Sequence, residues 1–346
     1  MMIPFFRPTK PDLNALEEVI KRGDYVSGKD VDLFEKEVAD YLGVKYAVAV
    51  NSGTDALVIA LECIHPPKGS EIITTPFTFW ATTEAILRVG AKPVFADITD
   101  DFNIDVEQVK ELMGGNTWAV LPVHLFGKPA SFATLSIGDF VVDDCCQAFG
   151  AKFDYDAELR CYSFFPTKTL GGYGDGGLIA TNNKHYAEDC KWRRNHGFVS
   201  KHYPLFPGYN SRLDSIQAAF LRKKLRTINK DIQERKDIAA FYDFNLTSKI
   251  GKPDLKEGVF NYYTIRAKNR RTLINHLIFS GIETKIFYPR LTCDNVHTPW
   301  DLEKVPNAVK ATQEALSLPM YPGLSMQELY QICDAVNYFY EKGGKK

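Results

Sequence analysis

A single lysine stands between an aromatic run and a glycine-rich turn in Cys161–Gly177, which reads CYSFFPTKTLGGYGDGG. The run Tyr162–Phe165 predicts a buried strand, Pro166 ends that strand, and the glycines allow a tight turn with positive φ. Lys168 is therefore presented from a tight connection, unlike an ordinary solvated lysine. A primary amine held in this way can attack an aldehyde carbonyl and form a Schiff base. The segment predicts covalent lysine chemistry.

Paired aspartates follow a second apolar run in Val141–Phe153, which reads VVDDCCQAFGAKF. Pyridoxal 5′-phosphate (PLP) acts as an electron sink when a carboxylate keeps its ring nitrogen protonated. Asp144 is the candidate for that carboxylate, and Gln147 is placed to lie near the ring or its phenolic oxygen. An aspartate at a strand end can equally cap the following turn, and the motif alone leaves both interpretations open.

A small-residue turn, NSGTDAL, joins the strand-like run YAVAV to an apolar helical pattern. Such a turn aims free backbone N–H groups at an anion, and the helix dipole adds to the attraction. Gly53 and Thr54 are the candidates for holding a phosphate. The alternative is that Ser52 or Thr54 is a plain helix N-cap.

An aromatic-rich junction, TTPFTFWATTEAI, follows the strand-like run EII. Trp80 or Phe79 could stack on a pyridine face, and core packing is the alternative explanation for both side chains.

Taken together, these segments resemble the DegT-type (DegT/DnrJ/StrS) sugar aminotransferases, a PLP-dependent family with the aspartate aminotransferase fold, fold type I. The likeness runs almost end to end. It includes DYVSGKDVDLFEKEVADYLGVKYAVAVNSGTDAL, PVHLFGKPA, SFFPTKTLGGYGDGG, GYNSRLDSIQAAFL and LSLPMYPGLS. So many matches in the same order make a chance resemblance improbable.

The resemblance implies roles around the cofactor ring. Lys168 occupies the position of the Schiff-base lysine, and Asp144 that of the partner of the pyridine nitrogen. Gln147 matches the neighbouring ring contact, and Trp80 falls where the family places a stacking side chain. The lysine also argues against the dehydratases of this fold, in which a histidine replaces it.

The resemblance also implies a phosphate site and a second subunit. Ser163 matches a serine that binds the phosphate alongside Gly53 and Thr54. Asn210, in GYNSRLD, matches an asparagine that reaches the phosphate bound by the other subunit, which implies a homodimer with shared sites. Arg212 is a candidate for binding an anionic group of the substrate, and a structural salt bridge, for example with Asp214, is the alternative.

The substrates implied by the resemblance are L-glutamate as amino donor and a nucleotide-linked keto-sugar as acceptor. NSRLD followed by SIQAA resembles the 3-aminotransferase branch, so a 3-keto sugar is favoured over a 4-keto sugar. A cyclitol or another ketone without a nucleotide remains an alternative acceptor. A non-catalytic regulatory homologue would be expected to lack Lys168, Asp144 or the phosphate-binding turn, and the sequence retains all three.

The chain departs from the family pattern in two places. Cys145 and Cys146 stand where small residues are usual between the paired acids and the glutamine. The stretch 127–161 is also shortened on both sides of these acids, which predicts a truncated helix between Gly127 and Val141. These departures bear on the substrate more than on the cofactor.

Composition excludes several other classes of protein. The 42 basic and 43 acidic residues give a net charge of −1, which does not favour binding to nucleic acid or to an anionic membrane. Seven cysteines without CxxC spacing argue against a disulfide framework or a zinc site, and neither His124 nor His196 has metal-ligand spacing. No metal is therefore expected. The absence of a signal-peptide pattern and of a long apolar run predicts a cytoplasmic protein.

The order of the predicted elements indicates an α/β fold in two domains. Strands alternate with helices over residues 46–183, which predicts a large domain with a mostly parallel mixed sheet. A long helix is expected from Ser211 onward, linking this domain (1–235) to a small C-terminal α+β domain (236–346). In the small domain, strands are expected at 261–267 and 283–289.

Overall fold

The computed structural model describes residues 2–132, 140–201, 203–295 and 300–343. The predicted truncation of a helix between Gly127 and Val141 involves residues 133–139, which lie outside the described residues.

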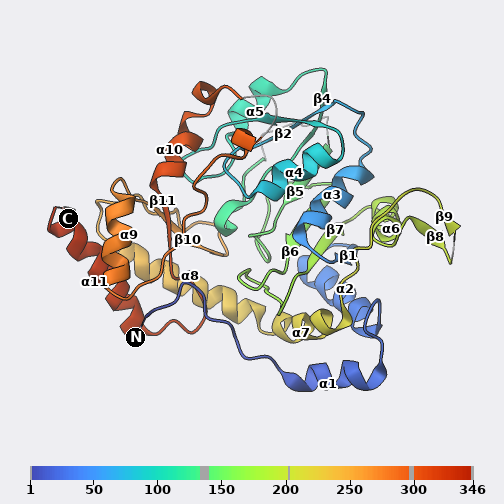
Figure 1. Cartoon of the computed structure of the whole chain (residues 1–346), viewed down its shortest axis with the longest axis horizontal. Coiled ribbons are helices and arrows are strands. Elements are labelled where there is room, and N and C mark those ends of the chain that lie inside the picture. The colour runs from blue at the N-terminus through green and yellow to red at the C-terminus, as the bar shows by residue number, and fades with distance from the viewer. Residues whose placement is uncertain (1, 133–139, 202, 296–299, 344–346) are drawn as a thin grey trace.

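A seven-stranded mixed sheet forms the centre of the molecule (Figure 1). Its strand order is β1-β7-β6-β5-β4-β2-β3, and β7 runs antiparallel to both of its neighbours while the other pairs are parallel. The predicted α/β fold with a mostly parallel mixed sheet is confirmed. The strands are β1 (Tyr46–Val50), β2 (Glu71–Thr74), β3 (Lys92–Phe95), β4 (Thr117–Val120), β5 (Phe140–Asp144), β6 (Leu159–Ser163) and β7 (Gly177–Thr181).

Helices cover both faces of this sheet because side chains alternate along each strand. Val48 and Val50 of β1 pack with α3, α4 and α6, whereas Ala47 and Ala49 pack with α2 and α7. The helices around the sheet are α1 (Leu13–Arg22), α2 (Lys29–Leu42), α3 (Gly53–Cys63), α4 (Trp80–Arg88), α5 (Val106–Leu112), η1 (Leu125–Gly127), α6 (Lys184–Arg193) and α7 (Ser215–Leu225).

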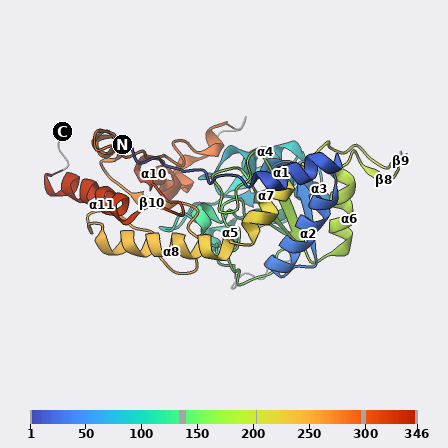
Figure 2. The same ribbon diagram turned by 90° about the horizontal axis from the view of Figure 1, so that it is seen from below.

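A second apolar core lies beyond the sheet, around the two-stranded antiparallel sheet β10–β11. Figure 2 shows α8 running from α7 toward α11 along the molecule. Ile232 of α8 packs in the core of the large sheet, whereas Ile238 packs in the second core. The elements beyond α7 are α8 (Ile228–Asn245), β10 (Tyr263–Arg266), α9 (Arg270–Phe279), η2 (Thr292–Asn295), η3 (Leu302–Lys304), α10 (Pro306–Glu314), β11 (Ala315–Leu318) and α11 (Met326–Glu341).

Two sequence predictions in this part of the chain are wrong. The long helix expected from Ser211 is two helices, α7 and α8, separated at Arg226 and Thr227. The hydroxyl and N–H of Thr227 both donate to the carbonyl of Lys224, at 3.2 and 3.0 Å, and so close the end of α7. The stretch 283–289 is not a strand, because its pairing is limited to an isolated bridge between Lys285 and Ser317.

Two peripheral segments bear on how the chain is organised. The hairpin of β8 (Phe198–Ser200) and β9 (Tyr203–Pro204) projects beyond α6, away from the sheet (Figure 1). The N-terminal segment begins beside the second core, where Ile3 exchanges backbone hydrogen bonds with Gly281 and Glu283. None of the helices in the described part of the chain has the length and apolar character needed to span a bilayer.

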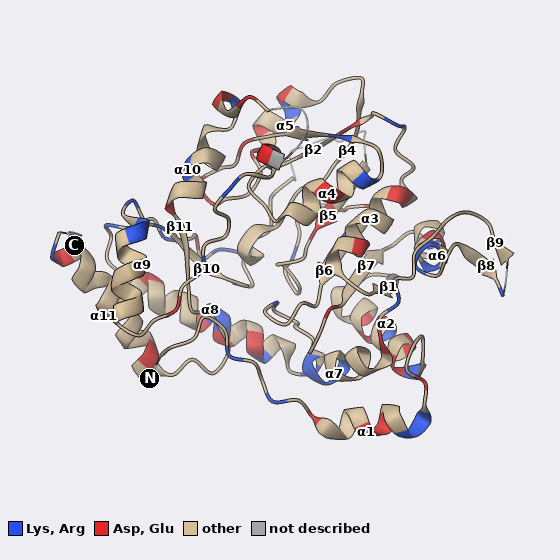
Figure 3. Ribbon diagram, in the orientation of Figure 1, with Lys and Arg blue, Asp and Glu red and all other residues tan. Residues whose placement is uncertain are grey.

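Basic and acidic residues are interspersed over the ribbon (Figure 3). The basic end of α7 faces acidic residues of α2, where Arg222 pairs with Asp30 at 2.6 Å and with Glu37 at 2.7 Å. These paired side chains are therefore part of the interface between α7 and α2.

Candidate active site

A cavity of about 530 Å³ opens at the carboxyl ends of β5 and β6, beside the N-terminus of α3. Ligands commonly bind at this edge of an α/β sheet. Most of the residues predicted from the sequence line the cavity. They are Gly53, Thr54, Asp144, Gln147, Ser163 and Lys168.

Lys168 lies in the tight connection that follows β6. Its backbone N–H donates to the carbonyl of Phe165 at 2.9 Å, and Gly172 N–H donates to the carbonyl of Phe164 at 2.7 Å. A Cβ on Gly171 would collide with the carbonyl of Pro166, so the turn requires glycine there for its close backbone approach. The positive φ predicted for the glycines of this turn is wrong, because none of those at 171–177 has one. The half-buried lysine side chain reaches the cavity from this turn.

Asp144 ends β5 and is buried, with 5% of its surface exposed. Its carboxylate accepts from the hydroxyl of Thr82 at 2.8 Å and from the N–H of Cys146 at 3.1 Å. Among the described residues, no lysine, arginine or histidine lies within ion-pairing distance of it. A buried carboxylate with only neutral donors is costly, and a cationic ring nitrogen in the cavity would offset that cost.

Gln147 is buried beside Asp144 and has both ends of its amide engaged. Its Oε1 accepts from Phe126 N–H at 2.8 Å, and its Nε2 donates to the Tyr288 hydroxyl at 3.0 Å. Burial raises the pKa of Tyr288 well above its usual value, so this hydroxyl keeps its proton. Tyr288 can therefore donate into the cavity while it accepts from Gln147.

The N-terminus of α3 forms a cradle against Ser163. Ser52 is the N-cap, and its hydroxyl accepts from Asp55 N–H at 3.1 Å. Within the described chain, the N–H groups of Gly53 and Thr54 have no hydrogen-bond acceptor. A Cβ on Gly53 would lie 2.7 Å from the Cβ of Ser163, so a larger residue would fill the cradle. Ser52 therefore caps the helix while Gly53 and Thr54 keep N–H groups free for an anion, so the two interpretations of this turn are compatible.

Phe79 and Trp80, the two candidates for stacking on a pyridine face, occupy different positions. Phe79 lines the cavity, has 60% of its surface exposed, and lies with its ring centroid 6.3 Å from that of Tyr288. Trp80 begins α4, is half-buried, and is not among the described residues that line the cavity. Phe79 is thus the better placed of the two to contact a bound ring.

Asn210 and Arg212 are not among the described residues that line the cavity of their own chain. The exposed Asn210 forms an isolated bridge with Asn195 near the projecting hairpin, and its Oδ1 accepts from Arg212 Nη2 at 2.7 Å. Arg212 Nη1 donates to Asn195 at 3.3 Å. In the described chain Arg212 forms no ion pair with Asp214, the alternative considered from the sequence.

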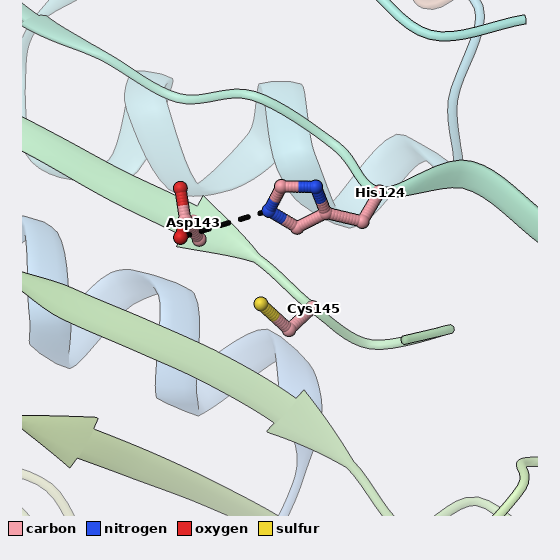
Figure 4. A group of neighbouring side chains, drawn as sticks. All are labelled: His124, Asp143 and Cys145. Atoms are coloured by element: carbon pink, nitrogen blue, oxygen red, sulfur yellow. Dashed lines mark ion pairs between the residues drawn. The ribbon is translucent and has the colours of Figure 1, made fainter. Parts of the chain in front are cut away.

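A buried cluster of His124, Asp143 and Cys145 lies at the carboxyl end of β5 (Figure 4), with potential ligand atoms within 4.8 Å of one another. His124 Nδ1 accepts from the N–H of Ala130 at 2.9 Å, and Nε2 faces Asp143 at 3.6 Å. Asp143 also pairs with Arg160 at 2.9 Å. Burial raises the pKa of Cys145 well above its usual value, so its thiol stays protonated. The chemistry of this cluster is that of a structural network and does not favour a metal.

Several residues that the sequence analysis did not single out complete the cavity. Thr82 comes from α4, whereas Tyr262, Phe287 and Tyr288 come from segments beyond α8. The aromatic residues of the sequence KIFYP could have indicated two of them, Phe287 and Tyr288. Tyr262, Phe287 and Tyr288 pack in an apolar cluster with Phe77 and Phe126, so their position depends on tertiary contacts.

These groups fit PLP. An amine suits its aldehyde, a buried carboxylate without a cation suits its ring nitrogen, and free N–H groups with a serine hydroxyl suit its phosphate. When bound, PLP supplies the electron sink for reactions at an amino-acid Cα.

Comparison with known proteins agrees with this chemistry. The model of the DegT/DnrJ/EryC1/StrS aminotransferase family matches residues 8–337. A UDP-2-acetamido-2-deoxy-3-oxo-D-glucuronate aminotransferase of Pseudomonas aeruginosa is 34% identical, over 93% of this chain and 94% of the relative. A protein of Geobacillus stearothermophilus named as a pleiotropic regulatory protein is 38% identical, over 97% of this chain and 96% of the relative.

The fold has a similar counterpart among solved structures. DesV of S. venezuelae, solved in complex with a ketimine intermediate, superimposes with a TM-score of 0.92 at 32% identity and covers 95% of this chain and 94% of its own. Sequence, fold and site agree, and the chain belongs to the DegT/DnrJ/EryC1/StrS aminotransferase family.

Proposed function

We propose that this protein is a PLP-dependent aminotransferase that moves an amino group from L-glutamate to a nucleotide-linked keto-sugar, with a 3-keto sugar as the preferred acceptor. The observation that carries the proposal is the convergence of three groups on one cavity. These are the amine of Lys168, the buried carboxylate of Asp144 and the anion cradle of Gly53 and Ser163.

In this proposal each residue has a distinct role. Lys168 would hold the cofactor covalently, and its amine would move a proton at the donor Cα. Asp144 holds the proton on the ring nitrogen. Gly53, Thr54 and Ser163 hold the phosphate, so that the reacting atoms stay near Lys168.

The sugar assignment is supported by the relative from Pseudomonas aeruginosa, whose name specifies a UDP-linked 3-oxo sugar. A cavity of about 530 Å³ has room for a cofactor and part of a substrate. The nucleotide would extend past Phe79, which lines the cavity and is exposed.

We further propose a homodimer in which Asn210 reaches the phosphate site of the partner. The exposure of Asn210, which is not among the described residues that line the cavity of its own chain, and the projecting hairpin beside it support this arrangement. Arg212 would then orient Asn210 through their 2.7 Å hydrogen bond. The same contact makes Arg212 a candidate for binding substrate in the shared site.

A regulatory role is the second candidate, because one relative is named as a pleiotropic regulatory protein. That name does not exclude catalysis, and this chain retains Lys168, Asp144 and the anion cradle. Catalysis is therefore the simpler proposal.

The deciding experiment is a substrate panel with the PLP-loaded protein and L-glutamate. It pairs a UDP-linked and a dTDP-linked 3-keto sugar with their 4-keto isomers and a keto-cyclitol, with 2-oxoglutarate formation as the readout. Turnover with a 3-keto sugar at least about tenfold faster than with its 4-keto isomer is expected. Turnover only with the cyclitol would overturn the sugar assignment, and no turnover with any acceptor would support the regulatory role.

A further inference from the structure

Two threonines flank Lys168, and both bond to one short segment that is distant in sequence. The hydroxyl of Thr169 donates to Asn261 Oδ1 at 3.2 Å, and the hydroxyl of Thr167 lies 3.0 Å from that of Tyr262. Thr169 has 8% of its surface exposed, and Asn261 is fully buried. The peptide that carries Lys168 is thus tied on both sides to the same place.

That segment, Val259–Tyr262, is called the clamp segment below, and a buried arginine fixes its path. Arg235 of α8 donates from Nη1 to the carbonyls of Phe260 at 3.3 Å, Asn261 at 3.2 Å and Met320 at 3.0 Å. Its side chain is 2% exposed, and among the described residues no carboxylate lies within ion-pairing distance. A buried guanidinium committed to carbonyls restricts the backbone that bears them.

The clamp segment also touches the opposite wall of the site. Tyr262 N–H donates to the carbonyl of Phe126 at 3.3 Å, and Phe126 N–H donates to Gln147 Oε1 at 2.8 Å. A Cβ on Gly127 would lie 2.8 Å from Asn261 N, so the two backbones run in close contact. One segment therefore contacts the two threonines that flank the lysine and, on its other side, Phe126, which in turn bonds to the predicted ring contact Gln147.

We propose that Asn261, acting through Thr169, is a positioning residue for Lys168, and that the clamp segment sets the position of the amine relative to Gln147. This inference rests on the proposed function. Neither Asn261 nor Thr169 lines the cavity, so their effect passes through neighbours that do, and the neighbour of Thr169 is Lys168. Lysine has a long flexible side chain, and the placement of its backbone decides where the amine can reach. A displacement of about 1 Å at a reacting group can cost about 10²-fold in rate.

The test replaces Thr169 by valine, which keeps the branched shape and removes the hydroxyl, and by serine, which restores the hydroxyl. With L-glutamate as donor, we expect Thr169→Val to lower kcat by about 10- to 100-fold while KM changes less than about twofold. The pH midpoint of the visible absorption band of the PLP-loaded protein should shift. Covalent trapping of PLP on Lys168 by borohydride, measured by peptide mass spectrometry, should slow. Thr169→Ser should return all three readouts to within about threefold of the parent protein.

Two further variants separate positioning from loss of folding. Thr169→Val leaves Asn261 Oδ1 without a donor, so the double variant Thr169→Val/Asn261→Leu removes both partners and should fold at least as well. Its kcat should be no lower than that of Thr169→Val, because both substitutions remove the same contact. The matched control is Thr264→Val, which deletes a buried hydroxyl bonded to Ser317 at 2.8 Å between β10 and β11. It should lower stability and leave kcat and the pH midpoint unchanged.

The outcomes are distinguishable. If the parent protein transaminates and Thr169→Val matches it in kcat, pH midpoint and trapping rate, the positioning role is wrong and the proposed function stands. An equal loss of kcat in Thr264→Val would also overturn the inference, because the loss would then follow from general destabilisation of the protein. If the parent protein shows neither a visible band nor trapping at Lys168, the proposed function fails and the inference fails with it.

Discussion

At the scale of single residues, Asp143 and Asp144 are neighbours with opposite surroundings. Asp143 is buried against Arg160 and the Tyr155 hydroxyl, at 2.9 and 2.7 Å. Asp144 is buried with two neutral donors. Because successive side chains of a strand point to opposite faces, one acid faces the structural network and the other faces the cavity.

The two acids should therefore respond differently to the same substitution. We expect Asp143→Asn to lower the free energy of unfolding of the cofactor-free protein by about 3 kcal/mol, because it breaks a buried ion pair. Asp144→Asn should leave that free energy unchanged or raised and weaken PLP binding by about tenfold or more, because it removes the partner of the ring nitrogen. Urea unfolding and PLP titration measure the two effects. Equal destabilisation by both substitutions would contradict the role given to Asp144.

At the scale of elements, the anion cradle depends on how closely α3 approaches β6. We expect Gly53→Ala to lower the free energy of unfolding by about 1–3 kcal/mol, because its Cβ would lie 2.9 Å from Cys146 Sγ as well as close to Ser163. PLP affinity should fall by about tenfold or more as the cradle fills. Gly115→Ala is the control, since a Cβ there meets nothing within 4 Å. Unchanged PLP affinity in Gly53→Ala would argue against a phosphate at this helix end.

The helix α7 contacts the turn that carries Lys168, and a lysine of this helix makes the stability of the protein depend on pH. Lys224 Nζ donates to the Gly171 carbonyl at 2.7 Å, and burial lowers the pKa of Lys224 from 10.5 to about 8. Below that pKa both the folded and the unfolded chain carry the proton. Between about pH 8 and 10.5 only the unfolded chain binds it, so the contribution of Lys224 to stability rises with pH.

Comparison with Lys224→Met isolates this contribution. The free energy of unfolding of the parent protein, minus that of Lys224→Met, should increase as pH rises from about 8 to 10.5. Lys223→Met, on the same helix, controls for the loss of a lysine. Urea unfolding at several pH values measures the difference, and parallel curves for the parent and Lys224→Met would show that the amine titrates normally.

At the scale of the whole molecule, the site is assembled from segments that lie far apart in the chain. Lys168 and Asp144 extend from the large sheet, whereas Tyr262 and Tyr288 come from segments beyond α8. The division at residues 235 and 236 stays a proposal. It is supported by the change of core between Ile232 and Ile238 along α8.

Subunit complementation tests the proposed shared site. Lys168→Ala and Asn210→Ala should each have little activity alone. After the two are unfolded and refolded together, about half of the dimers are mixed, and each mixed dimer carries one site with both Lys168 and Asn210 intact. Activity should therefore return to about a quarter of the parent value. No recovery, with mixed dimers demonstrated by differential tags, would contradict a site shared between subunits.

The sequence was most informative where the chemistry is local. The lysine turn, the paired acids and NSGTDAL each hold their functional groups within a few residues, and the strands predicted before the last two correspond to β5 and β1. The buried strand predicted at Tyr162–Phe165 only overlaps β6, which ends at Ser163 and leaves Phe165 exposed. Contacts that depend on tertiary packing were not predicted. Asn261 reaches Thr169 across 92 positions. The break between α7 and α8 was missed because the apolar spacing continues through it, and only the hydrogen bonds of Thr227 mark it.

The most direct test of the central claim is the visible spectrum of the PLP-loaded protein before and after addition of L-glutamate, without an acceptor. The proposed function predicts a band from cofactor bound to Lys168, its loss on addition of glutamate, and one equivalent of pyridoxamine phosphate per site. Lys168→Ala should lack the band. A band that glutamate leaves unchanged would contradict the assigned donor, and the absence of any band in the parent protein would contradict the role of Lys168.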